Sequence, residues 1–347
     1  MTSTSSGSWR AIWSAGWVWP KACPPSPSVG GLAVDISRFL AHPLIVDIKR
    51  HSLEDGPGIR SVVFFKGCPL RCVFCQNPEA QNPAPEIVFR RRLCIDCRLC
   101  VAACPQQALV QGPAALDRRK CHACGACARV CPSGAIVLVG TRLSIDEIID
   151  VLMRDEAYYR HSGGGVTLSG GECTVFPDFA GELLRRLRAA GIHTAIETCG
   201  EFSWDAFATC FLPHGDLILF DVKLADSRAH QVVTGRGNER IWCNLKNLLA
   251  ICPERVQVRI PLIPRVTDAR DNLSALAHRV AELGGRHLVL LPYNPLGATT
   301  AQNLGRPYPE DLPQSFQDAE QLRETVAWFT SEVARHSFQA LSERPKP

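Results

Sequence analysis

Short apolar segments alternate with helix-like patterns along most of the chain. The apolar segments are continuous runs of Val, Ile, Leu and Phe, which is the pattern of strands that are covered on both faces. They lie at residues 61–67, 166–169, 193–198, 216–223, 256–263 and 287–293. Strands that alternate with helices predict right-handed βαβ units and a parallel sheet. About six such units favour an incomplete parallel (β/α) barrel over a full eightfold one.

Amphipathic helices are predicted between these strands. The first begins after Ser144, which forms a capping box with Glu147, and its apolar residues recur at helical spacing over 145–152. Two further apolar stripes, at 179–187 and 273–280, each stop before a glycine. These helices complete the βαβ units.

Two parts of the chain break this alternation. Residues 85–139 are rich in Cys, Pro and Arg, and we predict that they form an inserted small domain. The barrel then has a first part at 44–84, and its remainder lies at 140–340 with a C-terminal helix. Residues 1–43 carry a cluster of tryptophans and then a Pro/Ser stretch, and we expect them to be a disordered tail that does not belong to the fold.

Composition narrows the class of protein. The net charge of the 347 residues is only +4 and the Lys and Arg residues are spread along the chain, which gives little support for nucleic-acid binding. No apolar run approaches the roughly 20 residues that cross a bilayer. The 17 cysteines are the outlier. Because thiolate clusters need a reducing compartment, we expect a cytoplasmic protein.

The first cysteine group is Cys68, Cys72 and Cys75, directly after a predicted strand. Three thiolates can hold three irons of a 4Fe–4S cluster and leave the fourth iron open for chemistry. A zinc site is the alternative, and it would need a fourth ligand, for which His51 is the candidate nearby. A loop of buried free cysteines is a third possibility.

Two further cysteine groups repeat the bacterial ferredoxin spacing, in which each run ends in Cys-Pro. In that pattern the fourth cysteine of each run binds the cluster of the other run. We therefore predict two 4Fe–4S clusters in the insert. The ligand sets are Cys94, Cys97, Cys100 and Cys131 for one cluster, and Cys121, Cys124, Cys127 and Cys104 for the other.

The run DGPGIR at 55–60, followed by FFKGC at 64–68, closely resembles the opening of glycyl-radical enzyme activating enzymes in the radical SAM superfamily. Further matches follow in the order of that family, and the resemblance spans roughly residues 44–310. It is similar to the subgroup that carries an inserted two-cluster ferredoxin domain. The matching segments are YYR at 158–160, SGGGVT at 162–167, SGGE at 169–172, ETCG at 197–200, DVK at 221–223, RIPLIP at 259–264 and LPYNPLG at 291–297.

This resemblance implies a reaction and its partners. S-adenosylmethionine (SAM) would bind the open iron of the first cluster and be cleaved reductively to methionine and a 5′-deoxyadenosyl radical. The radical would take a hydrogen atom from a glycine of a large glycyl-radical enzyme. An electron donor such as flavodoxin or ferredoxin is implied as a second partner. The 163–165 glycine run is expected to leave room for the partner's peptide loop.

The resemblance also implies a set of SAM contacts. Asp221 and Lys223 alternate along one strand and so share a face, and Arg259 could bind the SAM carboxylate or form a structural ion pair. Asn294 stands where the family usually has His, so its contact would come from an amide. A monovalent cation site is suggested near Glu197, Thr198 and Asp221. The implied cofactor-binding residues are Phe74, Cys75, Gln76, Gly170, Gly171, Glu172, Asp221, Val222, Lys223, Arg259 and Asn294.

Two other functions remain open on the sequence. A radical SAM enzyme could act on a small molecule or a peptide with auxiliary clusters, although such clusters usually follow the barrel rather than interrupt it. An electron-carrier subunit without SAM chemistry would have no use for a three-cysteine site with an open iron. An anaerobic SAM-cleavage assay separates these classes.

Overall fold

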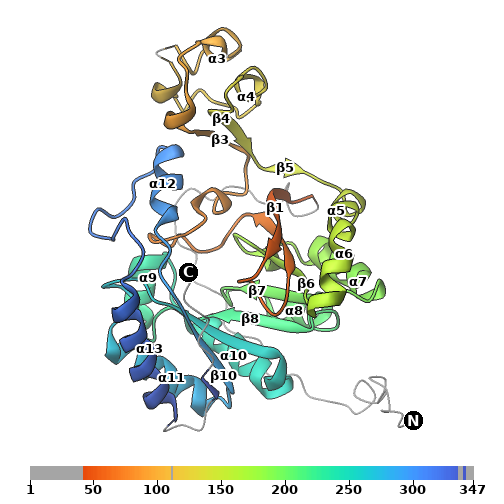
Figure 1. Cartoon of the computed structure of the whole chain (residues 1–347), viewed down its shortest axis with the longest axis vertical. Helices are drawn as coiled ribbons and strands as arrows, with labels where there is room; N and C mark the ends of the chain where they lie inside the picture. Colours follow the sequence, from red (N-terminus) through yellow and green to blue (C-terminus); the bar gives the residue numbers. More distant parts are fainter. Residues whose placement is uncertain (1–41, 111, 335–338, 341–347) are drawn as a thin grey trace.

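The computed structural model describes residues 42–110, 112–334 and 339–340. The tail predicted at 1–43 therefore lies almost wholly outside the described residues. In Figure 1 a curved sheet with helices packed around it forms a larger body, and a smaller body stands on it. No described helix is both long and apolar enough to cross a membrane.

One nine-stranded sheet forms the larger body, in the order β11-β10-β9-β8-β7-β6-β2-β1-β5. The strands β2 and β6 to β11 pair in parallel, whereas β1 pairs antiparallel with β2 and β5. These strands are β1 (Leu44–Ser52), β2 (Arg60–Lys66), β5 (Thr141–Arg142), β6 (Gly165–Gly170), β7 (His193–Thr198), β8 (Leu217–Asp221), β9 (Val256–Pro261), β10 (His287–Leu291) and β11 (Gln339–Ala340). The parallel strands β2 and β6 to β10 coincide with the six apolar runs, so the incomplete parallel barrel is confirmed.

Helices connect the parallel strands and cover the sheet (Figure 1). The capping box is present at the start of α5, where the Ser144 hydroxyl accepts a hydrogen bond from the Glu147 amide. The three predicted helices are α5, α7 and α11, and each is confirmed. The helices of the larger body are α5 (Ile145–Leu152), α6 (Glu156–Ser162), α7 (Pro177–Ala189), α8 (Trp204–Cys210), α9 (Ser227–Thr234), α10 (Glu239–Ile251), α11 (Arg270–Glu282), α12 (Leu296–Asn303) and α13 (Ala319–Ala334).

The apolar runs became strands because both faces of the sheet are covered. In β6, for example, every residue except the last is buried. β1 was not predicted, because the exposed polar residues Asp47, Lys49, Arg50 and His51 interrupt its apolar signal. It adds to the sheet as an antiparallel strand, which only needs one covered face.

The smaller body is the insert. The strands β3 (Glu86–Phe89) and β4 (Ile136–Val139) pair antiparallel, and two short helices, α3 (Leu99–Ala102) and α4 (Ala126–Arg129), lie between them in the chain. A separate cluster of buried residues forms its core, which includes Ile87, Cys100, Leu109, Cys127 and Ile136. Cysteines are thus part of the packing of this domain.

A charged cluster joins the insert to the barrel, and we call it the neck. Lys66 ends β2 with a fully buried side chain, and its ammonium donates to the Glu79 carbonyl at 2.6 Å and to the Glu86 carboxylate at 2.8 Å. Arg306, which follows α12, donates to the Pro78 carbonyl at 2.5 Å and to the other oxygen of Glu86. Glu86 opens β3, so one carboxylate of the insert neutralises two cations of the barrel.

Candidate functional site

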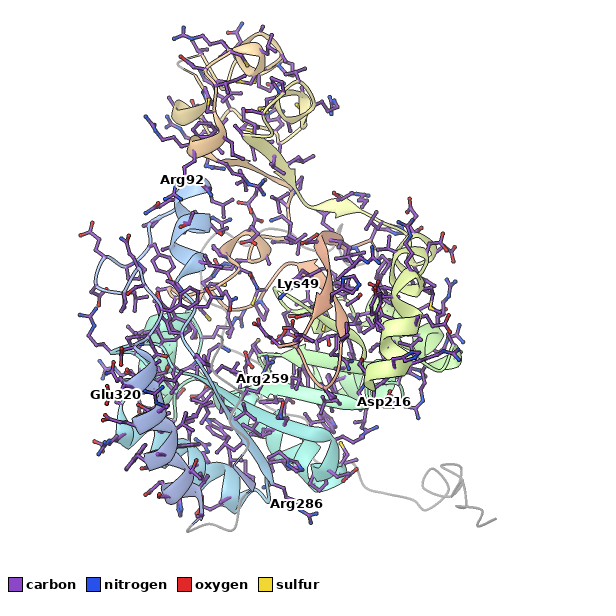
Figure 2. The ribbon with its side chains drawn as sticks, viewed as in Figure 1. Lys49, Arg92, Asp216, Arg259, Arg286 and Glu320 are labelled. Carbon is purple, nitrogen blue, oxygen red and sulfur yellow. The ribbon has the colours of Figure 1, made fainter. Side chains whose placement is uncertain are left out.

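A cavity of about 860 Å³ opens at the carboxyl ends of the parallel strands. Ligand sites of open parallel sheets generally lie at this edge. The cavity is lined by the first three cysteines and by every predicted SAM contact except Val222. Val222 instead packs in the hydrophobic core, because its side chain points to the other side of the backbone from Asp221 and Lys223. Figure 2 shows Arg259 inside the barrel, whereas Asp216, Arg286 and Glu320 lie at its periphery.

The cysteine loop at 68–75 is held by backbone hydrogen bonds. The amides of Arg71 and Val73 donate to the carbonyls of Thr234 at 2.7 Å and Val233 at 3.0 Å. The guanidinium of Arg236 donates to the Pro69 carbonyl at 3.0 Å. The loop after β2 is thus fixed against the C-terminal end of α9.

The three thiols of this loop fit a cluster better than a single ion. Burial raises the pKa of Cys72, and it raises that of Cys75 to about 12, so these thiols need a cation or a metal to ionise. Lys223 lies near Cys72 and favours its thiolate. Among the described residues, no group of three His, Cys, Asp or Glu side chains converges on one ion. A cube binds each thiolate to a different iron, so its ligands need not converge.

The fourth ligand that a zinc site would need is engaged elsewhere. The ring of His51 lies 3.1 Å from the carboxylate of Asp155, which is fully buried. Asp155 also accepts hydrogen bonds from Arg50 and Ser61, and these contacts lower its pKa to about 2. His51 therefore belongs to an ion-pair network at the end of β1 and does not line the cavity.

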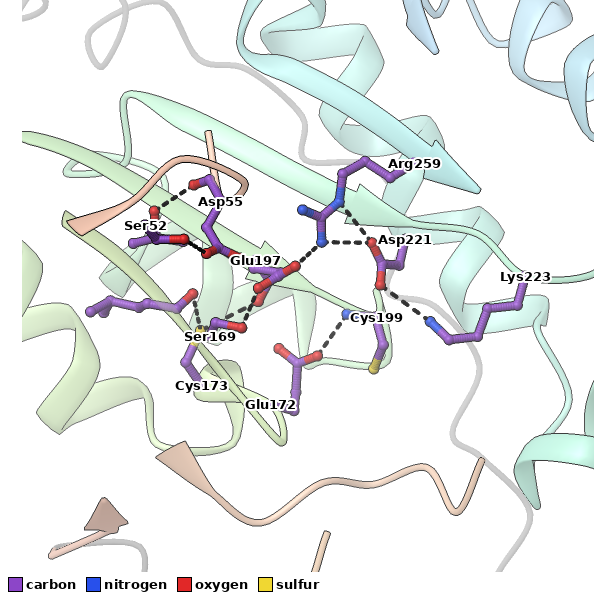
Figure 3. A network of polar contacts seen from close by, with 12 residues as sticks. Ser52, Asp55, Ser169, Glu172, Cys173, Glu197, Cys199, Asp221, Lys223 and Arg259 are labelled. Atoms are coloured by element: carbon purple, nitrogen blue, oxygen red, sulfur yellow. Dashed lines mark hydrogen bonds and ion pairs between the residues drawn. The ribbon is translucent and has the colours of Figure 1, made fainter. Parts of the chain in front are cut away.

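A charged network crosses the cavity wall at the ends of β7, β8 and β9 (Figure 3). The buried guanidinium of Arg259 contacts the carboxylate of Asp221 at 2.9 Å and also binds that of Glu197. The ammonium of Lys223 lies 3.5 Å from Asp221. Burial alone would lower the pKa of Lys223, but Asp221 and the nearby cysteines raise it above its usual value. The site therefore holds a lysine that stays charged.

This network bears on the expected monovalent cation, which stays a prediction. Glu197 and Asp221 were the carboxylates expected to hold it, and both are bound to Arg259. A fixed guanidinium supplies the positive charge at that position. For Arg259 the alternative of a structural ion pair is therefore the arrangement that the structure shows.

The loop at Gly170-Gly171-Glu172 is shaped by its packing. The Glu172 carboxylate accepts from the Cys199 amide and from the Thr174 hydroxyl, each at 2.7 Å, so it is bound within the protein. The amides of Gly171 and Glu172 donate to the carbonyls of Phe65 and Gly67. Carbonyl oxygens are the groups that this loop can still offer to a ligand.

Asn294 and α12 lie on the other side of the cysteine loop. The amide oxygen of Asn294 accepts from the backbone of Leu296 at 3.0 Å, just before α12 begins. The first turn of α12 packs so closely on the loop that a Cβ at Gly297 would lie 2.2 Å from the Cys75 carbonyl oxygen. The Asn294 oxygen is thus engaged at the start of α12, and its NH₂ group is the part that suits a SAM contact.

The sequence reasoning missed the rim of the cavity. Asp47, Lys49 and Glu54 line it from β1 and the turn that follows. Their polar character gave no motif, and β1 itself was not predicted. Glu79 also lines the cavity, and burial raises the pKa of its carboxyl.

The glycine run at 163–165 was expected to give room to a peptide, and this was wrong. A Cβ at Gly164 would lie 1.9 Å from the Ile59 carbonyl oxygen, and one at Gly165 would lie 2.0 Å from that of His193. Only Gly163 faces open space. Gly164 therefore packs on the 55–60 loop and Gly165 packs on β7, so the fold requires glycine at these two positions.

In the insert, cysteines that were predicted to bind the same cluster lie close together, including the one that comes from the other run. Cys94, Cys97, Cys100 and Cys131 line one small cavity. For the other set, burial raises the pKa of Cys127, and the charges of Cys121 and Cys104 nearby raise it further. The iron ligation itself stays a prediction, and the side chains present fit it.

Family models match three parts of the chain. The radical SAM superfamily model matches residues 118–277, and a 4Fe-4S dicluster domain matches residues 93–135. A model of a 4Fe-4S single cluster domain matches residues 54–104, which include the first cysteine group. Clusters, SAM chemistry and the predicted fold class are thus supported by the sequence families.

Relatives with known names are similar over most of the chain. One is the isethionate sulfite-lyase activating enzyme of Oleidesulfovibrio alaskensis, 41% identical over 76% of this chain and 87% of that protein. Another is the benzylsuccinate synthase activating enzyme of Thauera aromatica, 42% identical over 71% of this chain and 75% of that protein. Among solved structures, a domain of the pyruvate-formate lyase-activating enzyme from Bacteroides vulgatus matches 52% of this chain and all of that domain, with 24% identity and a TM-score of 0.42.

Proposed function

Because the chain belongs to the glycyl-radical enzyme activating enzymes of the radical SAM superfamily, we propose that its large cavity is where SAM is cleaved and where the partner's glycine is reached. The reaction of the family is reductive cleavage of SAM to methionine and a 5′-deoxyadenosyl radical, which abstracts a hydrogen atom from that glycine. The clusters supply the electron for this cleavage. The protein's own residues hold, orient and shield the reactants.

Cys68, Cys72 and Cys75 are the proposed ligands of the SAM-binding cluster. They share one cavity wall, and their loop is fixed by the backbone contacts to Val233 and Thr234. A loop that is already ordered holds the open iron at a defined place, which lowers the entropic cost of binding SAM there.

The methionyl end of SAM is proposed to lie between the Gly170–Gly171 loop and Lys223. The loop offers carbonyl oxygens, which suit an ammonium group, because its amides are bound to Phe65 and Gly67. Lys223 stays charged and suits a carboxylate. Arg259 keeps Asp221 in place beside Lys223 through its 2.9 Å contact. Phe74, Gln76 and Asn294 complete the proposed contacts from the side of the cysteine loop.

The identity of the partner enzyme is a separate matter. The two relatives named above are 41% and 42% identical to this chain, yet their names give different partners. Overall identity therefore does not select one. We propose a large glycyl-radical enzyme as partner, a flavodoxin or ferredoxin as electron donor, and the reducing cytoplasm as location.

The observation that carries this proposal is that the cysteine loop, Lys223 and the glycine loop line the same cavity. The test is to add a candidate glycyl-radical enzyme to the reconstituted protein with SAM and a reductant under strict anaerobiosis. We expect a stable glycyl-radical doublet in electron paramagnetic resonance. Changing the radical glycine of the partner to alanine should remove the doublet and leave basal SAM cleavage. Stimulation of SAM turnover by a small metabolite alone, with no doublet from any candidate, would contradict the proposal.

The insert is proposed to relay electrons to the SAM-binding cluster. Cys104 and Cys131 each belong to the ligand set of the opposite run, so Cys131→Ala removes one ligand from the cluster at Cys94, Cys97 and Cys100. We expect this variant to lose SAM cleavage driven by flavodoxin and to keep cleavage driven by dithionite, a small reductant that reaches the cavity directly. Both rates are measured as 5′-deoxyadenosine formed per minute. An equal loss with both reductants would show that the insert is only structural.

A further inference from the structure

The insert concentrates positive charge. Over residues 85–139 there are eight Lys and Arg residues against three Asp and Glu, in a chain whose net charge is only +4. The excess of positive charge in the chain therefore lies in the insert, which has few acidic residues. They are Arg90, Arg91, Arg92, Arg98, Arg118, Arg119, Lys120 and Arg129, and the acidic residues are Glu86, Asp96 and Asp117.

Exposed apolar side chains accompany part of this charge. Leu93 is 45% exposed, Ile95 is 65% exposed and Leu99 is 50% exposed. Arg91, Arg92 and Arg98 lie in the same stretch and are exposed too. We call residues 91–99 the 91–99 face. Arg92 lies on the insert in Figure 2, apart from the barrel interior at Arg259.

The internal repeat of the insert shows that these apolar residues are not required by the cluster fold. The two cysteine runs are offset by 27 residues, from Cys94 to Cys121. At the positions that match Leu93, Ile95 and Leu99, the second run has Lys120, His122 and Ala126. The same ferredoxin spacing is thus built there without large exposed apolar groups at these three positions. Three exposed apolar side chains on one short segment are typical of a surface that takes part in an interaction.

The 91–99 face also covers one proposed cluster site. Cys94, Cys97 and Cys100 belong to the face or adjoin it, and with Cys131 they line the same small cavity. Cys97 is itself exposed. A protein that docks on this face would bring its redox group close to that cluster.

We propose that the 91–99 face is the docking site of an acidic electron-carrier protein. The inference rests on the proposed relay function and adds the place where electrons enter. Arginines around an apolar patch suit a partner with acidic groups around an exposed redox centre, and such pairs form small, transient interfaces. In the step itself, one electron leaves the flavin hydroquinone of the carrier, which becomes the semiquinone, and one cluster of the insert is reduced.

The test uses an acidic bacterial flavodoxin, because a flavin protein brings no iron–sulfur absorption of its own. Affinity for the full reconstituted protein is measured by anaerobic calorimetry at low and at high salt. The variant R91E/R92E replaces two arginines on the proposed face. The matched control is R119E/K120E, which makes the same charge change at exposed positions just before the second cysteine run.

We expect R91E/R92E to bind flavodoxin at least roughly tenfold more weakly at low salt, with most of the difference lost at high salt. The control should stay within about threefold of the unchanged protein, because only the bulk charge of the insert differs. Iron content and dithionite-driven SAM cleavage should be unchanged in both variants, since neither replaces a cysteine or a residue that lines the large cavity.

Equal weakening by both variants would overturn the docking site, because it would show general attraction to a basic domain. A loss of glycyl-radical formation under dithionite in R91E/R92E alone would also overturn it. That result would show that the 91–99 face binds the glycyl-radical enzyme and not the electron carrier. If flavodoxin binds this face but Cys131→Ala keeps the flavodoxin-driven rate, the relay fails and the docking site stands. The two failures are therefore distinguishable.

Discussion

Replacing Cys68, Cys72 and Cys75 together with alanine is expected to abolish SAM cleavage and to leave about two-thirds of the iron, the share of the two clusters in the insert. The reason is that these thiols line the SAM cavity, whereas the other eight cysteines of the three groups lie in a domain with its own core. Iron is measured by colorimetric assay after anaerobic reconstitution, and cleavage as 5′-deoxyadenosine under dithionite.

The control for this variant is Cys252→Ala, which removes a thiol that is buried in the core of the barrel and does not line the cavity. It should keep the full iron content and the full cleavage rate. Residual cleavage in the triple variant would show that another group holds the catalytic cluster. Loss of all iron would show that the insert does not assemble clusters independently of the barrel.

Gly171→Ala is expected to lower SAM cleavage by about 100-fold, because a misplacement of roughly 1 Å at reacting groups has effects of this size. A Cβ at this position would lie 2.3 Å from the Gly67 carbonyl oxygen and 2.4 Å from that of Ala80. Both contacts are to backbone, so the methyl group has no flexible side chain to displace. It must push the glycine loop away from the start of the cysteine loop.

Gly163→Ala is the matched control, because a Cβ there meets no atom within 4 Å. Its positive φ of 68° makes the alanine cost about 1 kcal/mol of stability, but it leaves the cavity as it is. We expect near-normal cleavage from this variant at a temperature well below unfolding. If Gly171→Ala is equally active, close packing at the glycine loop is not what positions the reactants.

Much of the fold could be predicted because burial leaves a direct trace in the sequence. Strands such as β6 are covered on both faces and so read as apolar runs, and the spacing of cysteines follows from the shape of a cluster. The sequence of β1 gives no such apolar run, because the exposed polar residues Asp47 and Lys49 alternate with its partly buried positions. The cavity rim that it forms was missed for the same reason.

The candidate site was predictable in its membership but not in its contacts. Sequence motifs identified Glu172 and Arg259 as site residues. The sequence could not show that the Glu172 carboxylate is bound by Cys199 and Thr174. It also could not show that the Arg259 guanidinium binds both Glu197 and Asp221. Such pairings depend on which strand ends meet across the sheet. For Val222, alternation along the chain from Asp221 already indicated a side chain on the other face, so only its backbone is expected at the site.

The neck has a consequence for how such genes can change. Glu86 pairs with Val139, so the insert leaves and rejoins the barrel at adjacent points. A deletion from 86 to 139 would need only a short turn to rejoin the chain, and the large sheet would stay in register. It would also leave the fully buried ammonium of Lys66 without its carboxylate, at a cost of several kcal/mol. A descendant that discards this module must therefore also replace Lys66, with an apolar residue as the simplest solution.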